Sequence, residues 1–273
     1  TGVCVMKKIL ATILALVMAI GVTTMAWAAT EVKTAEELTS AINAGDVVDV
    51  KLGASFAANV VIPTGKTVTI ALNGNTLTND GGDTITVQKG AALIINGSGT
   101  VDNVTHGKAA IVNNGTATLN GGTYTRSKEN AENNKDNAGG NSYYTILTDK
   151  GATMTINAGV TVTNVGHFSS MIRNGGTGPD ASTLTINGGT FIQKTTNTSS
   201  YAKVVMTGIV EGYEAITKVT GGTFTNEKLS GIFWALGNAT SDNFEVSGGT
   251  FNKSISDGYC ADGFIPTKNA DGT

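Results

Sequence analysis

The sequence repeats one short phrase: an apolar residue, a polar residue, two glycines, threonine and an aromatic residue. Full copies occupy 119–124, 186–191, 219–224 and 246–251, and degraded copies occupy 72–77 and 95–101. The first three Asn-Gly pairs, at 73, 96 and 120, are 23 and 24 residues apart, and the last copies are 33 and 27 residues apart. A unit this short cannot bury its own apolar side, so it must stack on its neighbours.

A longer duplication lies over these repeats. Residues 89–115 match residues 150–176 without a gap at an offset of 61, with 13 of 27 positions identical. The shared residues include Asn96 and Asn157 as well as His106 and His167. We therefore expect the two segments to form similar coils, and the duplication accounts for the pairing of the histidines without requiring a metal site.

Strands separated by tight turns account for most of the remaining pattern. Apolar residues alternate with threonine over 68–72, 84–87, 116–119 and 182–186, which predicts half-buried strands with threonine outward. One helix precedes them. Thr34 and Glu37 form a capping box, Leu38 and Ile42 share one face, and Gly45 marks the end. Such a helix is suited to closing one end of a hydrophobic stack.

A parallel β-helix explains both the period and the residue choices. Leucine-rich repeats have a similar period, but the leucine framework that they need is absent. In stacked coils, equivalent residues meet along the axis. We expect an amide ladder and an interior apolar-to-aromatic stack. The ladder would contain Asn73, Asn96, Asn120, Asn157 and Asn187, and the stack Leu77, Val101, Tyr124, Phe191, Phe224 and Phe251.

These repeats and the capping helix resemble the pectate-lyase-like right-handed β-helix superfamily. More narrowly, they are similar to secreted GGTF-type repeat surface proteins of gut-type Gram-positive bacteria. The resemblance implies an all-β, single-stranded right-handed parallel β-helix (β-solenoid) with a short N-terminal capping helix. We assign 29–45 to the capping helix, 46–265 to the repeats and 266–273 to a C-terminal tail. In similar proteins further surface domains follow, so we expect the chain to be truncated there.

The N-terminus has the pattern of an export signal. Lys7 and Lys8 precede the apolar run 9–22, and 26–28 reads Ala-Trp-Ala, so we assign 1–28 to a signal peptide with upstream residues. Without these two lysines, 16 basic residues face 21 acidic ones, a net charge of −5 that disfavours nucleic acid. Only Cys260 would remain, which excludes a disulfide framework. We expect a secreted or cell-surface protein without a membrane span after cleavage.

Catalytic residues are not evident. Enzymes of the resembled superfamily use carboxylate-bound Ca²⁺ with an Arg or Lys base, or paired carboxylates as acid and base. This sequence has no Asp-x-Asp and no Asp-Asp, and the carboxylate pairs considered as candidates are Asp80/Asp83 and Glu211/Glu214. Turn chemistry explains the first pair and surface solvation the second. We predict no catalytic residue, no metal site and no cofactor, with a diverged polysaccharide lyase or glycoside hydrolase as the alternative.

The candidate ligand-binding residues are three aromatic and two basic residues: Tyr143, Tyr144, His167, Arg173 and Trp234. Aromatic rings stack on sugar rings, and a His/Arg cluster beside the long polar segment 127–141 could form a site on a solenoid. We expect a non-enzymatic extracellular module, adhesin-like or structural at the cell surface. Its expected partners are an extracellular glycan or a host or cell-wall surface.

Overall fold

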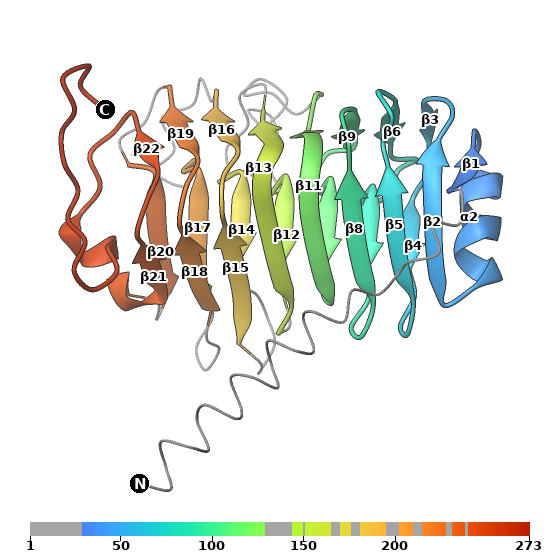
Figure 1. The fold of residues 1–273 in the computed structure, drawn as a ribbon, viewed down its shortest axis with the longest axis horizontal. Helices are drawn as coiled ribbons and strands as arrows, with labels where there is room; N and C mark the ends of the chain where they lie inside the picture. Colours follow the sequence, from blue (N-terminus) through green and yellow to red (C-terminus); the bar gives the residue numbers. More distant parts are fainter. Residues whose placement is uncertain are drawn as a thin grey trace, which may run out of the picture.

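The strands of this chain stack in parallel, coil upon coil, in a right-handed β-helix. The computed structural model describes residues 29–128, 144–149, 151–164, 170–175, 181–194, 202–209, 215–227, 231–237 and 240–273. Figure 1 shows the strands side by side in chain order, with α2 and β1 at one end and β22 with the C-terminal tail at the other. The predicted fold class is confirmed. The predicted signal peptide, residues 1–28, lies outside the described residues.

Each complete coil contributes a strand to each of three columns. The first column contains β1 (Thr30–Val32), β2 (Val47–Leu52), β5 (Thr67–Ala71), β8 (Ala92–Asn96), the start of β11 (Thr116–Thr125), the start of β13 (Thr153–Thr163), β15 (Ser182–Ile186), β18 (Ala215–Val219) and β21 (Phe244–Val246). The second contains β3 (Phe56–Ala57), β6 (Thr76–Thr78), β9 (Thr100–Asp102), the ends of β11 and β13, β16 (Thr190–Gln193), β19 (Thr223–Asn226) and β22 (Thr250–Phe251).

The third column is a separate sheet. It contains β4 (Val60–Ile62), β7 (Ile85–Val87), β10 (Ile111–Asn113), β12 (Ile146–Thr148), β14 (Ile172–Asn174), β17 (Val205–Ile209) and β20 (Phe233–Gly237). Besides the strands, the described residues form helix α2 (Ala35–Ala44) and two 3₁₀ turns, η1 (Ser241–Asn243) and η2 (Asp257–Tyr259). The four predicted strands correspond to β5, β7, β11 and β15.

The apolar-to-aromatic stack fills the interior behind the second column. Its members lie in register on successive strands, and Val162 completes the row between Tyr124 and Phe191. The rings of Phe191 and Phe224 stack with centroids 4.6 Å apart, and those of Phe224 and Phe251 with centroids 5.1 Å apart. Phe191 and Phe224 are buried, so burial and ring contact both stabilise the stack. This prediction is confirmed.

The exposed amide ladder is also present, at the corner between the first and second columns. The side-chain amide of Asn120 donates to Asn96 at 2.8 Å, Asn157 donates to Asn120 at 2.7 Å, and Asn187 donates to Asn157 at 3.0 Å. The hydroxyl of Thr220 continues the chain by donating to Asn187 at 3.2 Å. Five successive coils are therefore joined by side-chain bonds that all run in one direction.

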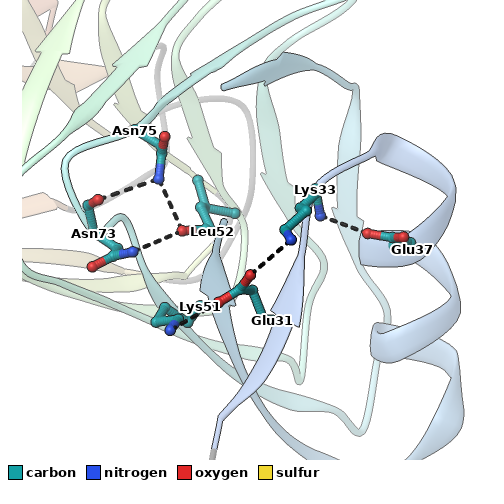
Figure 2. Close-up of polar contacts among 7 residues, drawn as sticks. All are labelled: Glu31, Lys33, Glu37, Lys51, Leu52, Asn73 and Asn75. Carbon is teal, nitrogen blue, oxygen red and sulfur yellow. Dashed lines mark hydrogen bonds and ion pairs between the residues drawn. The ribbon is translucent and has the colours of Figure 1, made fainter. Parts of the chain in front are cut away.

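Asn73 does not belong to this ladder, contrary to the prediction. Asn96 pairs with Ala71 instead, because the corner after β5 is longer than in the later repeats. Asn73 lies within that corner in the left-handed conformation, with φ of 53°. Its amide donates to the backbone carbonyl of Leu52 at 3.1 Å, beside Asn75, which donates to the same oxygen at 2.9 Å (Figure 2).

Helix α2 closes the N-terminal end as predicted. Thr34 is the N-cap, the helix ends before Gly45, and the buried residues Leu38 and Ile42 pack on the core. The capping contacts differ from a standard capping box. Glu37 N–H donates to the Thr34 hydroxyl, but the Glu37 carboxylate accepts from the backbone N–H of Lys33 at 2.6 Å (Figure 2). This hydrogen bond connects the first turn of α2 to Lys33, the residue that follows β1.

A second, buried row of polar side chains forms the corner between the second and third columns. Its members are Asn79, Asn103, Arg126, Asn164, Gln193 and Asn226. The amides of Asn79, Asn103, Gln193 and Asn226 donate to backbone carbonyl groups. Asn103 donates to Ala109 O at 2.8 Å, and Asn226 donates to Ala202 O at 3.0 Å. These bonds fix where each chain segment enters the third column.

Candidate functional site

The outward-facing row of the third column departs from the threonine pattern of the other strands. Register places these residues one above the next: Val61, Thr86, Val112, Leu147, Arg173, Met206 and Trp234. A strand alternates its faces, so their neighbours along each strand point into the core. This row therefore has large apolar and aromatic side chains together with one arginine at the outward positions of the coil. We call it the third-column face.

Arg173 and Tyr144 meet on this face. Tyr144 precedes β12, and Arg173 lies on the next strand, β14. The Arg173 Cζ atom lies 5.3 Å from the centre of the Tyr144 ring, and its Nη1 donates to the Tyr144 hydroxyl at 3.5 Å. Among the described residues, the buried Nε of Arg173 has no hydrogen-bond partner. The pair forms a cation–π contact that holds a multidentate donor in place.

Trp234 shares this row with Arg173, separated from it by Met206 on β17. Two strand spacings put their backbones about 10 Å apart. The intervening Met206 is 2% exposed, and Leu147 beside Tyr144 is 6% exposed. These two side chains are therefore covered although their positions face outward, whereas Tyr144, Arg173 and Trp234 are partly exposed. Such a combination of apolar contact with a few fixed polar groups is typical of ligand sites.

The structure thus brings together three of the five candidate ligand-binding residues, namely Tyr144, Arg173 and Trp234. The other two, Tyr143 and His167, lie outside the described residues. His106, the counterpart of His167 in the duplication, is exposed.

The acidic residues considered for catalysis take part in turn contacts where they are described, Asp83 through its carboxylate and Asp80 through its backbone N–H. Asp83 accepts from the backbone N–H of Ala109 at 2.7 Å, and the Asp80 N–H donates to the Asn59 side chain at 2.9 Å. Both contacts stabilise turns between coils. Glu211 and Glu214 lie outside the described residues. Across the ranges that the model describes, no three His, Cys, Asp or Glu side chains gather where they could hold a metal ion.

Threonine is frequent at the outward positions of the other two columns. On the second column, register aligns seven of them in one uninterrupted outward row: Thr76, Thr100, Thr123, Thr161, Thr190, Thr223 and Thr250. On the first column, β11, β13 and β15 each present threonine, threonine and asparagine outward. The long insertions in the sequence leave this regularity intact, because the strands keep their register across them.

The buried apolar residues of the third-column face were not predicted from the sequence. Leu147 and Met206 stand at outward positions where alternation favours a threonine or a charge, and this departure was the available signal. The row of seven threonines was not predicted either, although each one follows a repeat corner. Within the described ranges, no helix has the length and apolar content needed to cross a bilayer. Comparisons with family models, with curated proteins and with solved structures find no match to this chain.

Proposed function

We propose that this chain is a secreted, non-enzymatic β-helix module of the pectate-lyase-like type, adhesin-like or structural at the cell surface, which binds glycans through the third-column face. One observation carries the proposal: Tyr144, Arg173 and Trp234 share this face and are partly exposed, beside the buried Leu147 and Met206. Aromatic rings supply flat apolar contact to sugar rings, and the guanidinium supplies fixed donors to sugar hydroxyl or carboxylate oxygens.

The composition of this face favours binding over catalysis. Hydrolysis of a glycosidic bond needs two carboxyl groups about 5 to 10 Å apart across the bond. The outward row of the third column contains no aspartate or glutamate over its described strands. The smooth rows of threonine and asparagine on the other faces suit a rigid spacer. The diverged lyase or hydrolase remains the competing hypothesis, and the same experiment tests it.

The test is a glycan array that includes neutral and uronic-acid-containing chains, read beside a polysaccharide degradation assay. We expect binding to a subset of glycans without release of shorter products. Trp234→Ala should weaken that binding about tenfold, which corresponds to about 1.4 kcal/mol. Arg173→Lys should weaken it as well, because an ammonium cannot reproduce the planar fork of donors.

Thr118→Ala is the matched control, since Thr118 lies on the first column, away from the candidate site. Its affinity should equal that of the unaltered chain. Equal loss in Thr118→Ala and Trp234→Ala would remove the third-column face from the explanation. Glycan cleavage by the unaltered chain would replace the binding module with the enzyme.

A further inference from the structure

The last coil leaves a strand edge open at the C-terminal end of the solenoid. In the preceding step, the carbonyls of Gly222 and Phe224 accept from the N–H groups of Thr250 and Asn252, at 2.8 and 3.1 Å. The same carbonyls one coil later belong to Gly249 and Phe251. Among the described strands, β22 pairs with β19 alone, so its outer edge carries these groups without a further strand.

A cavity of about 580 Å³ lies against this edge. The last coil, including Gly249 and Phe251, lines one side, and the C-terminal tail lines the other. Phe264 and Ile265 belong to that tail wall and are 51% and 77% exposed. The site therefore combines free strand hydrogen-bonding groups with apolar side chains that lack full burial.

The aromatic stack also ends in this cavity. Phe191 and Phe224 are 0% and 1% exposed, because each is covered by a ring or side chain of the next coil. Phe251 is only partly buried and lines the cavity. A further large apolar side chain at the same position would cover its outer face and continue the stack.

Charge further restricts the occupant. Lys253 and Lys268 both line the cavity, and no aspartate or glutamate does. An occupant with a carboxylate at this point would gain attraction, and a basic one would be repelled.

We propose that this cavity binds an extended acidic peptide by strand addition. The peptide lies parallel to β22, takes its backbone bonds from Gly249 and Phe251, sets an aromatic side chain on the Phe251 ring and directs a carboxylate to Lys253 and Lys268. This is the mode in which main-chain bonds give affinity and pockets for alternate side chains give specificity. The site is independent of the third-column face and of glycan binding.

The probe is a synthetic peptide that copies residues 246–254 of this chain with Lys253→Glu. We expect saturable binding by fluorescence anisotropy. The peptide that keeps lysine should bind roughly tenfold more weakly, from charge repulsion. A third peptide with Phe251→Ser should lose binding, because it cannot extend the stack. Equal binding of the aromatic and serine peptides would overturn the proposal.

Three changes in the protein test the site itself. Ser254→Trp, at an exposed position in the lining, should fill the cavity and abolish peptide binding. Lys253→Glu should reverse the preference between the acidic and basic peptides, whereas the control Lys108→Glu, far from the cavity, should leave it unchanged. Ile265→Asp changes a residue that is 77% exposed, so it tests the contribution of the tail wall to peptide binding without destabilising the fold. If light scattering shows a dimer that Ser254→Trp dissociates, the occupant is a second copy and the peptide proposal fails.

Discussion

At the scale of single residues, the two glycines of the repeat have different tasks. The first allows close approach between coils. A Cβ on Gly221 would lie 2.7 Å from Asn187 O, and one on Gly248 would lie 2.3 Å from Thr220 O. The second turns the chain, since Gly222 and Gly249 have φ of 111° and 116°. The pair therefore meets a steric requirement and a conformational one at adjacent positions.

Gly221→Ala should destabilise the protein by about 1–3 kcal/mol, because the new methyl group meets the backbone of the coil beneath. Gly65→Ala is the informative comparison. Gly65 has φ of 83° with nothing within 4 Å of an added Cβ, so its alanine variant incurs only the conformational cost of about 1–2 kcal/mol. Urea unfolding of both variants measures the two costs separately. A stability of Gly221→Ala equal to that of the unaltered chain would contradict the crowding seen at this corner.

Asn157 tests the amide ladder. It donates to Asn120 and accepts from Asn187, so Asn157→Ala removes two bonds at once. The ladder is exposed and water replaces part of the loss, so we expect a cost of about 1–2 kcal/mol in unfolding free energy. Thr155→Ala, on the same strand and the same face, should cost less, because Thr155 lies outside the ladder. Equal costs would mean that strand propensity, rather than the ladder, decides stability here.

At the scale of elements, ion pairs connect β1, at the N-terminal end, to the first coil. Glu31 on β1 pairs with Lys33 at 3.1 Å and with Lys51 on β2 at 3.0 Å (Figure 2). The hydrogen bond from Lys51, then that from Lys33, lowers the pKa of the Glu31 carboxyl. A carboxyl whose pKa is lowered by folding stabilises the folded state above its unfolded pKa, and this contribution is lost as the pH falls through the folded value.

Acidification should therefore loosen β1 before the rest of the solenoid. Between about pH 7 and about pH 3, amide hydrogen exchange of Thr30–Val32, corrected for its intrinsic pH dependence, should lose protection. In Glu31→Gln the same amides should start less protected and change less with pH. Exchange at Val68–Ile70, in the next coil but one, serves as the internal reference. A pH response of β1 that survives Glu31→Gln would assign the effect to other carboxyls.

Local patterns determined which elements could be predicted. The helix and the four alternating strands follow from residues within a few positions of one another, and the structure has them at the expected places. Asn73 was misassigned because corner length varies between coils, and nothing in the local sequence states how many residues a corner absorbs. The shared row of Arg173, Met206 and Trp234 was hidden for the same reason, since insertions of different length separate its members.

At the scale of the whole molecule, the two ends of the solenoid differ in the elements that cover them. The N-terminal end is closed by α2, which contacts β1, β2 and β4 over the core. At the C-terminal end, the part of the chain that the structure describes has an unpaired outer edge on β22, an isolated bridge between Val246 and Cys260, and a cavity beside the tail. In a stacked repeat protein each coil is stabilised by its neighbours. Here the Tyr259 ring packs on Phe233 and Phe244, so the tail covers part of the core while the outer edge of β22 is unpaired among the described strands.

Leu38→Asp tests what the N-terminal cap prevents. Leu38 is 1% exposed on the core side of α2, and a buried unpaired carboxylate there should detach the helix from the first coil. The apolar side chains beneath the helix and the edge of β1 would then face solvent, so we expect concentration-dependent oligomers by light scattering while the strand signal in circular dichroism remains. Thr39→Asp, one residue further along on the exposed side of α2, should stay as monodisperse as the unaltered chain. If Leu38→Asp instead unfolds the entire solenoid, the coils form one cooperative unit whose folding depends on helix α2. The main role of α2 would then be to support folding rather than to shield the strand edge.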